Sequence, residues 1–305
     1  TAVTPGSLVA TALLAHDRRG IAEDQLFDAC DRLARTLRRA GARFSPSLGA
    51  LGQQKSGVRE ALDLFTRAGH VEAHRVGGDA IYVVPAEARM SLDLAKNVIM
   101  HFFVARALIA TTLLVSGSGG TPGVPAKAET VRERVLALSR LFKHEFTFRA
   151  DARFETIFDE EVAAMEQDGE LARVFLDGDA AGGLAPRGED GRIQVELYAR
   201  LVENFIDGYR IAARGLAALL KGPLALKDVV KRAIPTGERM FLAGEIARRE
   251  AVSSPLLENA YASFVDQGYL SRAGGKLALT ESYATQSAVG TIEARIAAMG
   301  ARAPG

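Results

Sequence analysis

The longest apolar segment of the chain covers residues 91–116, and neither Pro nor Gly interrupts it. Such a run predicts one long helix that is either buried or in contact with a membrane. A helix that spans a bilayer needs about 20 mostly apolar residues with few charges. Arg106 in the middle of the run, with His101 nearby, offsets the gain from the apolar side chains. We therefore expect a buried core helix, and a helix lying on a membrane surface is the second interpretation.

Arg106 falls on the most apolar face of this segment at helical spacing, together with Phe102 and Ile109. A buried guanidinium has to be paired, because an uncompensated buried charge is costly. We expect Arg106 to be charged and to pair with a carboxylate from another helix. A contact with a phosphate or a lipid head group is the alternative.

Apolar periodicity and end signals predict further helices around this segment. Thr4 is a good N-cap and Pro5 a good first residue for a helix over 5–16. The other predicted helices cover the ranges 22–40, 56–67, 129–148, 154–167, 194–220, 227–249 and 255–266. Gly-rich loops are predicted over 117–125 and 177–191. The helices at 5–16, 22–40, 56–67 and 129–148 are expected to cover the central one.

A shorter pattern recurs after three helices. Each occurrence has a Gly, a short apolar–polar alternation, a Gly-containing turn and a second alternation, in RAGHVEAHRVGGDAIYVV, QDGELARVF with GRIQVEL, and VDQGYLSRAGGKLALT. The pattern predicts small two-stranded hairpins. They are either a common way to end a helix or part of winged-helix-like units. No basic recognition helix lies beside them, which argues against nucleic-acid binding.

These elements predict a mainly α fold, a multi-helix domain with small two-stranded hairpins following helices. We expect one helical region over 1–150 around the central apolar helix 91–116. A second helical region with short hairpins is expected over 151–305, unless both form one continuous domain.

Composition and charge narrow the class of protein. The chain is 48% hydrophobic and 25% charged, which is ordinary for a globular protein, and its net charge of +1 creates no general attraction to nucleic acid or anionic membranes. The single cysteine, Cys30, excludes an intramolecular disulfide and a Cys-based zinc cluster, and it fits a reducing compartment. The first residues are not a signal peptide, and the Thr1 start suggests a processed chain or a piece of a longer protein.

Catalytic motifs are nearly absent from the sequence. It contains no phosphate-binding glycine loop, HExxH, CxxC or GxSxG, and its histidines lack convincing metal-ligand spacing. His74 and Asp79 match H-x4-D, in which a carboxylate orients a general base. The pair spans a predicted hairpin turn, so we interpret the match as coincidental. We predict no catalytic residue, no cofactor and no metal.

Three segments carry a family resemblance: TPGSLVATALLAHDRRGIAEDQLF, AKNVIMHFFVARALIATTLL and LSRLFKHEFTFR. The most specific residues are Lys96-Asn97 followed by His101-Phe102, and Leu141-Phe142-Lys143 followed by Glu145-Phe146. Together they resemble the carboxyl-terminal region of the glycerol-3-phosphate acyltransferases, shared with the dihydroxyacetone-phosphate acyltransferases. The likeness is good over residues 1 to about 150 and vaguer from there to 284.

The resemblance implies acyl transfer from an acyl-CoA or acyl carrier protein thioester to glycerol 3-phosphate, the first step of phospholipid synthesis. In that family an H-x4-D pair and a Phe-Pro-Glu-Gly block do the chemistry upstream of this region, and this chain lacks the second block. The implied role is therefore non-catalytic support of an upstream catalytic domain. The implied location is peripheral, on the cytoplasmic face of a membrane.

Phe102, Phe103 and Arg106 are the candidates for a membrane or domain contact, and plain core positions are the alternative for all three. The expected partners are the upstream catalytic domain, the membrane surface and, through that domain, the acyl donor, with no nucleic acid. A different function class is a helical interaction or regulatory module with winged-helix-like hairpins that binds protein or nucleic acid. A third is a free-standing acyltransferase that uses His74 and Asp79.

Overall fold

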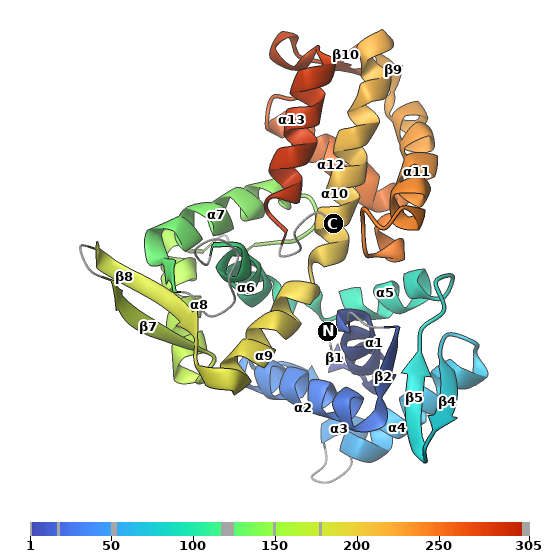
Figure 1. Cartoon of the computed structure of the whole chain (residues 1–305), viewed down its shortest axis with the longest axis vertical. Helices are drawn as coiled ribbons and strands as arrows, with labels where there is room; N and C mark the ends of the chain where they lie inside the picture. The colour runs from blue at the N-terminus through green and yellow to red at the C-terminus, as the bar shows by residue number, and fades with distance from the viewer. Residues whose placement is uncertain are drawn as a thin grey trace. The chain divides into compact units, whose positions relative to one another are not determined.

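The computed structural model describes residues 2–16, 19–49, 54–116, 125–148, 151–176 and 179–300. Within these ranges the chain is mainly helical with small sheets, which confirms the predicted fold class (Figure 1). The chain divides into two compact units, residues 1–104 and 105–305. The division expected near residue 150 lies inside the second unit.

The first unit is built around helix α1 (Pro5–Ala15), which packs against α2 (Glu23–Arg39), α4 (Gln54–Arg67) and α5 (Arg89–Asn97). As predicted, Thr4 caps α1, and its side chain and that of Ser7 bond each other's backbone N–H in a capping box. The remaining elements are β1 (Ala2–Val3), β2 (Gly20–Ala22), β3 (Arg43–Phe44), α3 (Pro46–Gly49), β4 (Glu72–Val76), β5 (Asp79–Val83) and the short 3-10 helix η1 (Met100–Phe102).

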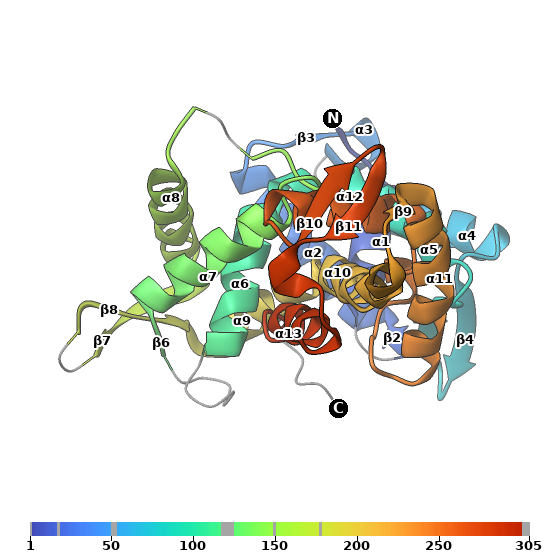
Figure 2. The same ribbon diagram turned by 90° about the horizontal axis from the view of Figure 1, so that it is seen from above.

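The second unit begins with α6, which the structure assigns to Val104–Ser116. Its other elements, in chain order, are β6 (Ala126–Lys127), α7 (Ala128–Leu141), α8 (Phe154–Gln167), β7 (Leu171–Leu176), β8 (Asp179–Pro186), α9 (Gly188–Arg200), α10 (Glu203–Gly215), η3 (Leu216–Lys221), β9 (Leu224–Ala225), α11 (Leu226–Leu242), η4 (Arg249–Ala251), α12 (Ser254–Asp266), β10 (Leu270–Ala273), β11 (Lys276–Leu279), η5 (Glu281–Tyr283) and α13 (Gln286–Ala297). The strands β9, β10 and β11 gather at one end of α10, and α13 runs beside that helix (Figures 1 and 2).

One connectivity occurs three times: helix, short strand, helix, helix, strand, strand. The first occurrence has β3 and α3 inserted before its third helix, and the third has the 3-10 helices η3 and η4. The connectivity begins at α1, at α6 and at α10, and we call these segments the first, second and third copy. Each predicted hairpin gains a third strand, because the short strand pairs with the last one in sheets β2-β5-β4, β6-β8-β7 and β10-β11-β9. This is the connectivity of a winged helix, so the recurring sequence pattern marks a repeated architectural unit.

The same glycine turn links the third helix of each copy to its hairpin. Gly69, Gly169 and Gly268 have φ of +72°, +77° and +74°, a region that suits glycine because it lacks a Cβ. Two positions later in each copy lies a buried apolar residue: Val71, Leu171 and Leu270. The turn therefore ends the helix and places the first apolar side chain of the hairpin in the core.

The prediction of one long helix over 91–116 was wrong. The chain forms α5, then η1, and only then α6. From Asn97 to Val104 every residue except Met100 is Asn, Val, Ile, His or Phe, all weak helix formers, so little opposes a break there. No helix in the described ranges has both the length and the apolar character that crossing a membrane requires.

Other predicted boundaries need correction. Helix α7 ends at Leu141, not near 148, and the C-cap residue Phe142 packs its ring in an aromatic cluster. Residues 179–186 of the expected loop 177–191 form β8, and GRIQVEL lies in α9. The helix expected over 194–220 breaks between α9 and α10, and α13 was not predicted. Residues 117–124 of the other expected loop lie outside the described residues.

Candidate functional site

Arg106, near the start of α6, is buried among acidic side chains of its own unit. Its Nε donates to Glu161 at 2.7 Å, and its Nη1 donates to Asp168 at 2.8 Å and to Glu170 at 3.0 Å. The Tyr198 hydroxyl donates to Glu170 at 2.7 Å. The cluster joins α6 to α8, to the turn after α8 and to α9, which confirms that Arg106 is paired.

Electrostatics keep this guanidinium charged. Burial by itself lowers the pKa of Arg106, but the charge of Glu170, with Tyr198 and Asp168, raises that pKa well above its usual value. With carboxylates from Glu161, Asp168 and Glu170 already bound, the guanidinium has little capacity left for another anion. The cluster therefore favours a structural ion pair over the phosphate or head-group contact.

The other two contact candidates differ in exposure. Phe103 is completely buried, whereas Phe102 is half-buried and its ring centroid lies 4.1 Å from that of His101. Burial also lowers the pKa of His101. Phe103 thus occupies a core position, and Phe102 has a partly accessible ring at the end of η1.

His74 and Asp79 lie on opposite strands of the β4–β5 hairpin, and both are exposed. The strand register places His74 opposite Ile81 and Asp79 opposite Val76, so the two are not directly paired. The imidazole Nε2 of His74 lies 3.2 Å from the Glu72 carboxylate instead.

The residues that carry the family resemblance are engaged in packing and ion pairs. The Asp93 carboxylate forms an ion pair with Lys96 Nζ at 2.8 Å and accepts a hydrogen bond from Asn97 Nδ2 at 3.0 Å. Lys96 is buried. These contacts hold together the α5 helix of the first unit.

The LFKHEF segment joins the second copy to the third. The Phe142 ring lies 5.1 Å from Tyr209, edge to face, and Phe146 lies 4.8 Å from Phe205. Lys143 and His144 both contact the Asp266 carboxylate on α12, at 2.8 Å and 2.5 Å, and Lys143 in particular lowers the pKa of that carboxyl. The segment is therefore a junction inside the second unit.

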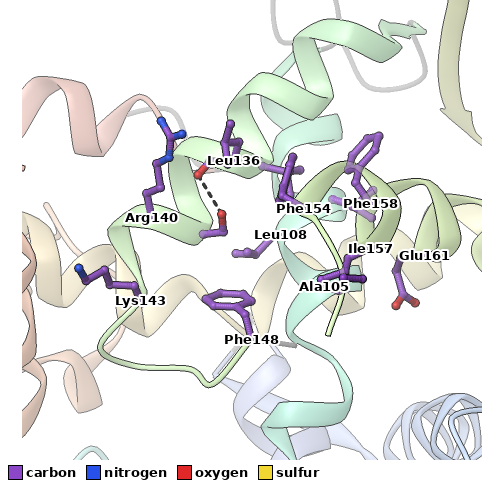
Figure 3. Close-up of a pocket in the computed structure, with 14 residues that line it drawn as sticks. Ala105, Leu108, Leu136, Arg140, Lys143, Phe148, Phe154, Ile157, Phe158 and Glu161 are labelled. Atoms are coloured by element: carbon purple, nitrogen blue, oxygen red, sulfur yellow. Dashed lines mark hydrogen bonds between the residues drawn. The ribbon is translucent and has the colours of Figure 1, made fainter. Parts of the chain in front are cut away.

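An apolar cavity of about 240 Å³ opens beside the Arg106 cluster, between α6, α7 and α8. Figure 3 shows Leu108 at its centre, Phe148 on one side, and Phe154, Ile157 and Phe158 on another. Arg140 and Lys143 lie at one end and Glu161 at the other. The cavity is the candidate functional site, because it combines apolar walls with a few charged groups.

The sequence did not identify this site. Its walls come from apolar positions of three helices that look like ordinary core positions. The acids around Arg106 were not predicted either, although Asp168 and Glu170 flank the recurring Gly169. Among the described residues, no group of His, Cys, Asp and Glu is arranged to hold a metal ion.

Comparisons with known proteins agree with the sequence resemblance. The family model described as "Glycerol-3-phosphate acyltransferase C-terminal region" matches residues 1–273. Proteins named "Putative acyltransferase plsB1" from Mycobacterium bovis and Mycobacterium tuberculosis are each 25% identical to this chain over 260 residues. The alignment covers 85% of this chain and 40% of each relative. The chain thus spans about two fifths of the length of the curated relatives it matches.

Proposed function

Because this chain belongs to the glycerol-3-phosphate acyltransferase C-terminal region family, we propose that it is the non-catalytic carboxyl-terminal part of a glycerol-3-phosphate 1-O-acyltransferase. Such an enzyme moves an acyl chain from a thioester to glycerol 3-phosphate in the first step of phospholipid synthesis. The family match over residues 1–273 is the observation that carries the proposal.

The non-catalytic role is supported by the local chemistry. His74 is exposed and directed to Glu72, and it lacks the buried setting in which a general base is tuned and oriented. The family-like residues Lys96, Asn97 and Phe142 make internal contacts. We infer that the chain packs against an upstream catalytic domain, which itself meets the acyl-CoA or acyl carrier protein.

Peripheral membrane attachment on the cytoplasmic face is the second part of the proposal. Phe175 on the β7–β8 hairpin is 86% exposed and Leu242 at the end of α11 is 84% exposed. The hairpin extends away from helices α6 to α8 (Figure 1). Exposed large apolar side chains of this kind suit insertion at a membrane surface.

Acyl transfer from palmitoyl-CoA to glycerol 3-phosphate tests the proposal. The 305-residue chain is compared with the same chain preceded by its native upstream sequence, and each is also made as His74→Ala. We expect activity only in the longer protein, unchanged by His74→Ala. Activity of the short chain that disappears in His74→Ala would instead establish a free-standing acyltransferase.

A protein-binding module is a second candidate, favoured by the threefold winged-helix connectivity. Nucleic acid is a poor partner for it, because α8, the third helix of the second copy, carries five acidic residues and no basic one: Glu155, Asp159, Glu160, Glu161 and Glu166. Absence of acyl transfer from both the short and the extended protein would favour this candidate.

A further inference from the structure

The interior of the cavity in the second copy is chemically apolar. Leu108 and Ile109 come from α6, Val135 from α7, and Phe154 and Phe158 from α8. The Ser139 hydroxyl in the lining already donates to the Leu136 carbonyl at 2.9 Å (Figure 3). An occupant of this space therefore has to be apolar, because a polar group would lose its hydrogen bonds with water and gain none.

The size of the cavity suits a short length of alkyl chain. Its volume is about 240 Å³. A water-sized group needs about 10–15 Å³ of such space, so the cavity has room for an alkyl chain of several carbons.

The two ends of the cavity carry charged side chains of opposite sign. Lys143 is paired with Asp266 at 2.8 Å, whereas Arg140 is exposed and makes no side-chain hydrogen bond or ion pair within the described part of the chain. Glu161, at the opposite end, is bound to Arg106 at 2.7 Å. An anionic head group such as a carboxylate is attracted to the exposed guanidinium at the Arg140 end.

The helices of the third copy pack more closely than those of the second. Helices α10, α11 and α12 pack closely on one another, and Gly208 and Gly237 lie against Leu256 and Ile211 at distances that leave no room for a Cβ. Helices α6, α7 and α8 contain no glycine, and α6 approaches the other two less closely. The same connectivity thus encloses a close-packed core in one copy and a cavity in the other.

We propose that the cavity between α6, α7 and α8 binds a fatty acid, with part of its alkyl chain against Leu108 and Phe158 and the carboxylate at Arg140. The site goes beyond the proposed function, since it requires neither acyl transfer nor a catalytic domain. It would let the protein respond to free fatty acid.

Isothermal titration of the 305-residue chain with decanoate, decanol, decyltrimethylammonium and decyl phosphate tests the assignment. We expect one decanoate per chain, binding about tenfold tighter than decanol because the charged hydrogen bond to Arg140 is lost with the alcohol. Decyltrimethylammonium should not bind. Equal binding of all four probes, or none of decanoate, would overturn the proposal, and tighter binding of decyl phosphate would overturn the carboxylate head group.

Two variants test the two parts of the site. Arg140→Gln should weaken decanoate binding about tenfold, whereas Arg134→Gln, on the same helix but outside the lining, should not change it. Ala152→Phe places a ring in the cavity from a non-helical segment and should abolish binding of decanoate and decanol alike. Circular dichroism checks that each variant folds. If Ala152→Phe does not fold, the Arg140→Gln result decides, and unchanged decanoate affinity there overturns the proposal.

Discussion

Arg106 anchors the start of α6 through three carboxylates, and its removal would take away the guanidinium that they share. Arg106→Gln should destabilise the protein by about 3–5 kcal/mol, the cost typical of breaking a buried ion pair on one side. Arg134 is exposed and its guanidinium donates to the Ser116 hydroxyl, so Arg134→Gln should change stability by less than about 0.5 kcal/mol. Urea unfolding of both variants measures the difference.

Asp207 on α10 is the second buried charge with a measurable consequence. Burial raises its pKa from 3.8 to about 6, although the backbone N–H groups of Ala247 and Arg248 donate to it and favour the charged form. The folded protein thus holds the proton at pH values where the unfolded chain has lost it. Stability contributed by this group is present below about pH 4 and is lost as pH rises toward 6.

Asp207→Asn should remove this dependence. Between pH 4 and 7 the unfolding free energy of the natural protein should fall by up to about 3 kcal/mol relative to the variant, which is the free energy of the pKa shift. Chemical unfolding across that range measures it, with Asp63→Asn on the exposed face of α4 as the control. If the unfolding free energies of the natural protein and of Asp207→Asn change with pH in the same way, the pKa of Asp207 is near its ordinary value.

At the scale of single residues the sequence predicted that Arg106 is paired but not with which groups. The need for a partner follows from the apolar face on which Arg106 lies. The partners stand 55 to 92 positions away, on α8, in the turn after it and on α9, and no local spacing connects them to α6. The cavity was missed for the same reason, since its walls come from three helices.

At the scale of helices and strands, end signals were more informative than apolar runs. The structure begins α1 where Thr4 and Pro5 predict a helix start. It ends a helix just before each of the glycines Gly69, Gly169 and Gly268. The run 91–116 shows apolar character without a break, but its weak helix formers from 97 to 104 were the better guide. The strands β2, β6 and β9 are too short for alternation to reveal them.

Close helix packing in the third copy depends on glycine. A Cβ at Gly208 would lie 2.3 Å from Leu256 Cδ2, so Gly208→Ala should destabilise the protein by about 1–3 kcal/mol through overpacking. Gly290 lies in α13, where a Cβ meets nothing within 4 Å, so Gly290→Ala should stabilise by about 0.5–1 kcal/mol. Thermal unfolding of both variants compares them, and equal effects would contradict the packing explanation.

The junction between the second and third copies should depend on its aromatic rings. Phe142→Ala removes a fully buried ring that contacts Tyr209 and Phe205, and we expect a loss of about 3–5 kcal/mol. Phe175→Ala on the exposed hairpin should cost less than about 0.5 kcal/mol. Urea midpoints measure both, and a small effect of Phe142→Ala would mean that the junction relaxes around the missing ring.

For the whole molecule, charge and exposed apolar residues predict how membranes are bound. With a net charge of +1, any association with vesicles should depend little on anionic lipid or on salt. Phe175→Ala combined with Leu242→Ala should reduce co-sedimentation with neutral phosphatidylcholine vesicles several-fold, because both side chains are exposed. Binding that requires anionic lipid and disappears in salt would instead indicate a local basic surface.

The threefold connectivity also has a consequence for synthesis on the ribosome. In each copy the short strand after the first helix is synthesised well before the last strand, with which it pairs. The paired residues are Gly20 and Val83, Ala126 and Leu184, and Leu224 and Leu277. At about 5–20 residues per second, several seconds separate the emergence of the two partners. These early strands are two or three residues long, which is too short to form a stable β-sheet with a neighbouring nascent chain. The polypeptide can therefore close its copies one after another as it leaves the exit tunnel.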